Sequence, residues 1–138
     1  SNLVWALETQ VRSRGIGVVL CAPLDIILSD RTVVQPDIVF IATDRLGRIS
    51  ERGIEGAPTL VVEILSPSTS ETDRNTKLRL YASYGVPYYW IVDPDARVVE
   101  AYALVGASYT LSKRVAGDEP LSAEPFPDLA LASASLWA

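Results

Sequence analysis

The hydrophobic residues of this chain recur at spacings that predict two helices among several strands. Residues 3–14 carry apolar side chains on one face at helical spacing and are followed by Gly15, which predicts a helix that ends there. Residues 73–84 predict a second helix, which Gly85 ends. A hydroxyl side chain is expected to cap the first turn of that helix, and the candidates are Ser68, Thr69 and Ser70.

The other apolar runs are rich in β-branched and aromatic residues and have the length of strands. They cover residues 18–21, 24–28, 32–43, 60–65, 88–92, 97–104 and 108–115. The first two runs are bent at Pro23, which predicts a hairpin or a kinked strand. The last two alternate across a turn at Gly106, which predicts a hairpin.

The polar stretches between these runs predict loops. Residues 44–58 contain several glycines and are expected to form a long loop. Residues 117–127 hold three of the nine prolines and are therefore expected to be irregular, whereas residues 129–137 predict a final strand or short helix. Because strands lie on both sides of the helices in the sequence, the pattern predicts one α/β domain over residues 1–138, built on a mixed sheet.

Composition narrows the chemistry that the chain can perform. It has no histidine and a single cysteine, Cys21. Ser-His-Asp catalysis, histidine acid–base catalysis, cysteine-based zinc sites and an internal disulfide are therefore excluded. Asp, Glu, Lys, Tyr or a carboxylate-bound metal remain as the sources of reactivity. The net charge of −5 argues against a strong nonspecific nucleic-acid binder, although not against an enzyme with a local basic face and a metal.

The location and assembly of the protein can also be predicted. No apolar run approaches the length of a membrane span and no signal peptide is visible, so we expect a cytoplasmic protein without membrane association. Ser1 and Asn2 have the character of a tag remnant and no initiator Met is present, so we expect the native start to lie upstream. The apolar residues within 129–137 predict self-association, most simply as a homodimer.

Two acids lie in predicted strands, Asp37 directly after a proline and Glu63 within an apolar run. If their strands are adjacent, the carboxylates would lie close together and repel unless a cation or a proton lies between them. A divalent metal would suit that position and could activate water for phosphodiester hydrolysis. The alternative is structural: Asp37 caps a turn, and Glu63 pairs with Lys77 or Arg74.

The segments around these acids carry a set of motifs that is specific only in combination. In chain order they are Gln35-Pro36-Asp37-Ile38-Val39, Val62-Glu63-Ile64-Leu65-Ser66-Pro67-Ser68-Thr69, Asp73-Arg74 with Lys77, Tyr81, Gly85-Val86 and Tyr89-Trp90-Ile91-Val92-Asp93-Pro94. Together they resemble the Uma-two family of restriction-endonuclease-like proteins in the PD-(D/E)xK nuclease superfamily. The resemblance implies a central mixed β-sheet flanked by helices. It also implies a hydrolase, a Mg²⁺-dependent (or Mn²⁺-dependent) endonuclease that acts on nucleic acid, with DNA as the expected partner.

The resemblance also assigns roles to residues. Asp37 and Glu63 match the two catalytic, metal-binding acids, and the backbone carbonyl of Ile64 is implied as a third metal ligand. The superfamily pattern has a lysine two residues after the second acid, where this chain has Leu65. The resemblance therefore implies that Lys77, on the following helix, is the displaced catalytic lysine, which would orient the attacking water and stabilise negative charge.

Lys77 also has a structural interpretation, an i,i+4 pair with Asp73 on a solvated helix face. We favour the site role because the helix directly follows the Glu63 strand, and we expect the ammonium to lie within the ~4–6 Å at which opposite charges shift a pKa. The presence of Leu65 and the negative net charge favour an alternative, a catalytically inactive nuclease-fold module that binds nucleic acid or a protein partner. A purely structural oligomer would be favoured if Lys77 pointed away from Glu63.

Four further residues have weaker assignments. Glu8 matches an acid on the first helix of such nucleases, with an exposed helix charge as the alternative, and Asp25 fits a further metal ligand in the first hairpin. Tyr81 and Trp90 are predicted to lie in the core rather than to stack on bases. The predicted loop also holds basic residues that could contact phosphates or simply be solvated, namely Arg45, Arg48 and Arg52.

Overall fold

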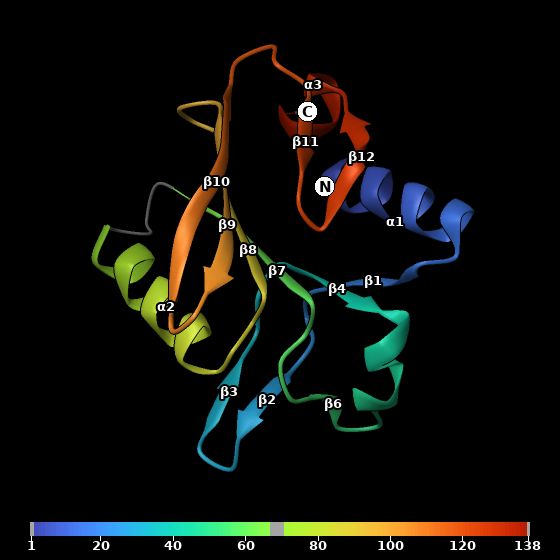
Figure 1. Cartoon of the computed structure of the whole chain (residues 1–138), viewed down its shortest axis with the longest axis vertical. Helices are drawn as coiled ribbons and strands as arrows, with labels where there is room; N and C mark the ends of the chain where they lie inside the picture. The colour runs from blue at the N-terminus through green and yellow to red at the C-terminus, as the bar shows by residue number, and fades with distance from the viewer. Residues whose placement is uncertain (1, 67–70, 138) are drawn as a thin grey trace.

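The computed structural model describes the backbone of residues 2–66 and 71–137 and, except at 71–73, their side chains. Its main element is a six-stranded sheet flanked by two helices, α1 (Asn2–Arg14) and α2 (Glu71–Ser83) (Figure 1). In spatial order the strands are β1 (Gly17–Cys21), β4 (Ile38–Ala42), β7 (Leu60–Ile64), β8 (Tyr88–Asp93), β9 (Val98–Val105) and β10 (Ser108–Ala116). The predicted α/β fold, a mixed sheet flanked by helices, is confirmed.

The sheet is mixed because one pair of strands is parallel. β7 and β8 run parallel and are joined through α2, whereas the other neighbouring strands are antiparallel. A parallel pair needs a long crossover, and α2 provides it. Both predicted helices and the predicted central strand are confirmed within two residues at each end. The proposed cap residues 68–70 lie outside the described residues.

Alternation along the central strands divides the core into two layers. Val62 and Trp90 face α1, whereas Val61 and Tyr89 face α2, as expected for strands whose successive side chains point to opposite faces. All four side chains are buried, and so is Tyr81, which α2 presents to the sheet. The predicted burial of Tyr81 and Trp90 is confirmed. Of the described helices, none has the length and apolar character needed to cross a membrane.

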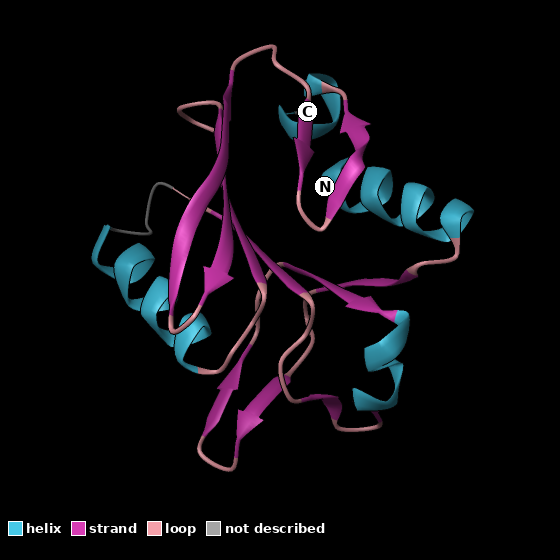
Figure 2. Cartoon of the chain, viewed as in Figure 1, coloured by secondary structure: helices cyan, strands magenta, loops and turns pink. Residues whose placement is uncertain are grey.

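The C-terminal segment forms a small subdomain over α1. A two-stranded sheet of β11 (Leu121–Ala123) and β12 (Phe126–Leu131) is followed by α3 (Ser133–Trp137), and Figure 2 shows this hairpin near α1. The prediction that residues 117–127 are irregular is wrong, since they contain β11 and the start of β12, whereas the strand or short helix predicted for residues 129–137 is confirmed. Leu129, Leu131 and Leu136 are buried there in the α1 layer of the core. The chain thus covers its own apolar tail, so the reason given for self-association is removed; the homodimer stays a prediction.

A second sheet has four strands in the order β3 (Thr32–Val34), β2 (Ile26–Ser29), β6 (Gly53–Glu55) and β5 (Ile49–Ser50). The prediction of a hairpin or kinked strand around Pro23 is therefore wrong, because β1 and β2 belong to different sheets. The prediction of a long loop over residues 44–58 is also wrong, since this segment contains β5, β6 and most of a 3-10 helix, η1 (Thr43–Arg48). Gly53 permits this packing: a Cβ there would lie 2.2 Å from the carbonyl oxygen of Asp25.

Candidate active site

Asp37 and Glu63 lie side by side on neighbouring strands. Ile38 of β4 is opposite Val62 of β7 in antiparallel register, so the residue before Ile38 lies beside the residue after Val62. Asp37 Oδ2 accepts a hydrogen bond of 2.7 Å from the backbone N–H of Ile64. The expectation that adjacent strands bring these two acids together is confirmed.

Glu63 is a buried carboxylate with two donors on one of its oxygens. The Tyr81 hydroxyl donates to Glu63 Oε2 at 2.9 Å, and Lys77 Nζ lies 3.4 Å from the same oxygen. The Glu63 side chain is 8% exposed and that of Lys77 is 35% exposed. Lys77 thus lies within the distance expected from the sequence, and it remains open to solvent on one side.

The environment of Glu63 disfavours its charged form. Burial is the main cause that raises the pKa of Glu63, and the nearby charge of Asp37 raises it further, against the opposing effects of Lys77 and the Tyr81 hydrogen bond. Burial, followed by the charge of Glu63, raises the pKa of Tyr81 well above its usual range, so its hydroxyl keeps its proton and acts as the donor. A cation bound beside Glu63 would stabilise the carboxylate.

Three oxygen atoms remain for such a cation. The contacts described for Glu63 use Oε2 and the contact described for Asp37 uses Oδ2, so Glu63 Oε1 and Asp37 Oδ1 remain. The third oxygen is the backbone carbonyl of Ile64. The N–H and C=O of one strand residue point to the same edge, so the Ile64 carbonyl faces the Asp37 side as its N–H does. Two carboxylates and a carbonyl suit Mg²⁺ or Mn²⁺, which keep several waters and take substrate phosphate oxygens as further ligands.

Two further acids considered from the sequence do not join this group. Within residues 2–66 and 71–137 no cluster of three or more His, Cys, Asp or Glu could hold a metal. Asp25 is exposed and accepts a 2.7 Å hydrogen bond from Gln35 Nε2. Glu8 pairs with Arg12 on α1, which covers the other face of the sheet. The structure therefore does not bring Asp25 into this group, so its role as a further ligand stays a prediction, and Glu8 is a helix surface charge.

Comparison with known proteins gives the family and the fold of the chain. Residues 1–134 match the family model described as "Uma2: Putative restriction endonuclease". The chain belongs to the Uma2 family. Its structure is similar to the crystal structure of "a putative nuclease belonging to DUF820" from Anabaena variabilis ATCC 29413, with a TM-score of 0.76 and 23% identity over 97% of this chain and 75% of that chain. This likeness shows the fold. A search of curated proteins finds no match.

Two of the three loop arginines of this Uma2 chain are engaged before the start of β7, away from the two acids. Arg45 and Arg48 donate to the carbonyl oxygen of Ala57 at 3.0 and 2.6 Å, and Arg52 pairs with Glu55 at 3.1 Å. Ala57 precedes β7, whereas the candidate site lies near the end of β7, about 20 Å along an extended chain. A role for Arg45 and Arg48 in holding phosphate at the candidate site is therefore not supported, whereas Arg52 lines a hollow with Asp25 and Gln35 and its contact with phosphate stays a prediction.

The structure adds two contacts that sequence analysis of this Uma2 chain missed. The sequence predicts only a core position for Tyr81, yet its hydroxyl reaches Glu63. Its spacing from Lys77 was the available signal, since residues four apart share a helix face. The second is the ion pair of Arg74 with Glu100 on β9, which holds α2 to the sheet. No local pattern shows this pairing, because it depends on which strands are neighbours.

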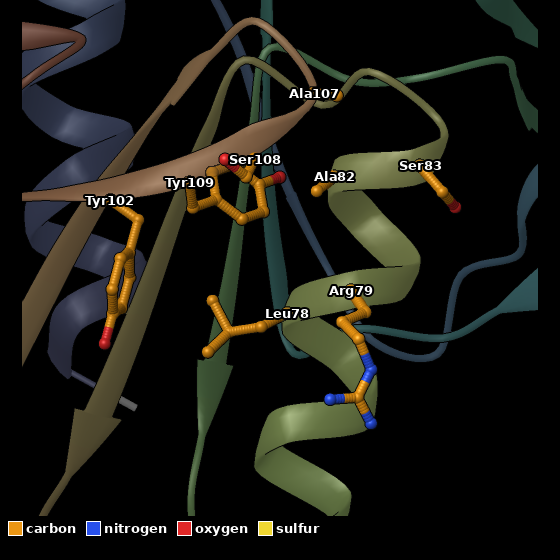
Figure 3. Close-up of a pocket in the computed structure, with 8 residues that line it drawn as sticks. All are labelled: Leu78, Arg79, Ala82, Ser83, Tyr102, Ala107, Ser108 and Tyr109. Carbon is orange, nitrogen blue, oxygen red and sulfur yellow. The ribbon is translucent and has the colours of Figure 1, made fainter.

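A separate hollow of about 240 Å³ lies between the C-terminal half of α2 and the β9–β10 turn (Figure 3). Its lining includes Leu78, Ala82, Tyr102 and Tyr109, and the Tyr109 hydroxyl donates to the Val86 carbonyl at 2.8 Å. Neither of the two acids nor Lys77 lines it. This hollow is therefore separate from the candidate site at the end of β7.

Proposed function

We propose that this Uma2 protein is an endonuclease that depends on Mg²⁺ (or Mn²⁺) and hydrolyses phosphodiester bonds of nucleic acid, with DNA as the first substrate to test. The observation that carries the proposal is the convergence of Asp37, Glu63 and Lys77 at one end of the sheet. Membership of a family described as "Putative restriction endonuclease" supports the same reaction class. A carboxylate this buried is costly without a cation or a strong partner.

In the proposed mechanism the strand residues bind the metal, and the residues of α2 orient Glu63 and contact the phosphate. Asp37, Glu63 and the Ile64 carbonyl would hold the metal, which would supply an activated water and stabilise charge on the phosphate. Tyr81 and Lys77 hold Glu63 by one oxygen and so orient the other. The partly exposed ammonium of Lys77 would bind a phosphate oxygen and orient the attacking water. Lys77 would thus take the role of the lysine that the superfamily pattern has at position 65, where this chain has leucine.

A second candidate is a nuclease-fold module that binds nucleic acid or a protein partner without cutting. Two observations favour it: Leu65 occupies the usual lysine position, and the chain carries a net charge of −5. Cleavage assays separate the two functions. The enzyme should nick or cut a generic DNA in Mn²⁺ or Mg²⁺ and lose this activity in EDTA, whereas the inactive module would leave the DNA intact under both conditions.

The metal site can be tested without a substrate. Calorimetric titration of Mn²⁺ should show binding, and metal at about 100 times its Kd should stabilise the fold by about 2.7 kcal/mol. The double variant Asp37→Asn with Glu63→Gln should lose both effects, because it removes both charged ligands. A matched control with the same change in charge is Glu8→Gln with Asp25→Asn, which should keep them. Metal binding that persisted in the first double variant would refute the site.

Tyr81 offers a finer test of the same site. Tyr81→Phe removes only the hydroxyl that holds Glu63 Oε2, so the carboxylate loses its orientation and the metal affinity should fall by about 10- to 100-fold. Tyr109→Phe is the control, since it removes a hydroxyl from the same aromatic cluster that bonds only to a backbone carbonyl. Calorimetry with Mn²⁺ should show the loss in the first variant alone. Equal affinities would assign Tyr81 to stability only.

A further inference from the structure

A second polar hollow, of about 210 Å³, lies on the α2 face of the sheet close to the candidate site. It is lined by Arg74, Ile91, Asp93, Ala96, Val98, Glu100 and Arg114. Glu63, Ile91 and Glu100 are opposite one another on β7, β8 and β9, so the hollow is about two strand spacings, or ~10 Å, from Glu63. A nucleotide beside the proposed scissile phosphate would be within its reach.

The charged groups of this hollow are arranged in two sets. Arg74 and Glu100 form an ion pair, which neutralises both and holds α2 against β9. Arg114 is opposite Glu100 on β10 and is exposed, and among the described side chains no acid pairs with it. Asp93 lines the hollow beyond the ion pair, and its Oδ1 accepts a 3.1 Å hydrogen bond from the Ala96 N–H. One guanidinium and one carboxylate oxygen are thus open to a ligand.

This pattern fits a neutral ligand better than a phosphate. The two arginines and two acids of the lining balance, so the hollow offers little net attraction for an anion. It offers donors and acceptors above an apolar floor formed by Ile91 and Val98. Its volume is below the ~300 Å³ at which pockets for drug-sized ligands begin, and it suits a single flat ring system.

Guanine has the matching groups. Its O6 and N7 accept two hydrogen bonds from one arginine, and its amino group donates to an acid. We propose that this hollow binds an unpaired guanine of the nucleic-acid substrate next to the cleaved bond, with Arg114 donating to O6 and N7 and Asp93 accepting from the amino group. The assignment rests on the proposed function and extends it to a substrate class, a nucleic acid with an unpaired guanine near the cut.

The test measures binding of short fluorescent oligonucleotides by anisotropy in EDTA, where metal-dependent cleavage cannot proceed. One probe is oligo(dT) and the other is the same strand with a single central guanine. The native protein should bind the guanine-containing strand about fivefold more tightly or better, the discrimination expected of one bidentate pair. Arg114→Ala should abolish this preference, and Asp93→Asn should reduce it.

The adjacent residue gives a matched control. Lys113→Ala removes the same charge from the same strand, but Lys113 is opposite Ala101 and so lies on the α1 side of the sheet. This variant should keep the preference for guanine. Equal binding of both strands by the native protein, or a preference that survives Arg114→Ala, would overturn the guanine assignment and leave the proposed nuclease function standing. Absence of binding to either strand would also overturn the guanine assignment, whereas the nuclease function is decided separately by the cleavage assay in Mn²⁺, because EDTA removes the metal that would bind the phosphate.

Discussion

Replacing Lys77 with alanine is expected to lower the rate of DNA cleavage by about 100- to 1000-fold, the cost of removing one preorganised donor from a charged transition state. Within the described residues, Lys77 is the cation that contacts Glu63: its ammonium lies 3.4 Å from Glu63 Oε2 and is open to solvent on one side. Leu65 cannot provide a positive charge. The chemistry of the proposed endonuclease therefore depends on α2 for its cation.

The same variant should still bind Mn²⁺, because the proposed ligands on the strands are untouched. Calorimetry and a cleavage assay on one preparation distinguish loss of chemistry from loss of the metal. Arg79→Ala is the matched control, since Arg79 is an exposed cation two residues further along α2. It should cleave at the native rate. Full cleavage by Lys77→Ala would remove Lys77 from the mechanism, and loss of metal binding would give it a structural role.

Trp90→Ala is expected to lower the free energy of unfolding by about 3–5 kcal/mol, the usual cost of truncating a buried aromatic residue. Trp90 has no exposed surface and lies in the α1 layer of the core. Its ring meets that of Phe126 edge to face at 5.9 Å, and its Nε1 donates to the Glu124 carbonyl at 2.9 Å. Truncation would therefore leave a cavity and an unpaired carbonyl between the main sheet and the C-terminal subdomain.

Urea unfolding measures this effect, and Trp5→Ala is its control. Trp5 is 71% exposed on α1, so the same truncation should change stability by less than about 0.5 kcal/mol. Trp90→Phe keeps most of the ring volume and should fall between the two, which preserves the test if the alanine variant does not fold. Equal stability of the Trp90 and Trp5 alanine variants would contradict the packing described for the α1 layer.

Elements with a strong local signal were predictable from the sequence, and those that depend on distant partners were not. Helical spacing in residues 3–14 and the β-branched run in residues 60–65 each repeat over several residues, and both elements are present. The strands β5, β6 and β11 have two or three residues each, so they exist only because another segment pairs with them. β1 pairs with β4, and β2 pairs with β6 as well as with β3. A bend at Pro23 does not indicate which strands β1 and β2 pair with.

The candidate site shows the same division. Asp37 and Glu63 could be found because an acid in an apolar strand is unusual and because their motifs resemble a known family. The contact of Lys77 with Glu63 followed from the resemblance and from the short connection between strand and helix. The pairing of Arg74 with Glu100 could not be predicted, since these residues meet only when β9 is placed two strands from β7.

Tyr81 has two separate structural roles, one for its ring and one for its hydroxyl. Its ring packs against that of Tyr89 at 5.0 Å, while its hydroxyl holds the carboxylate of Glu63. Phenylalanine at position 81 would keep the ring contact and remove one of the two donors to a buried carboxylate. A single oxygen atom therefore separates the contribution of this residue to the packing of the core from its contribution to the proposed site.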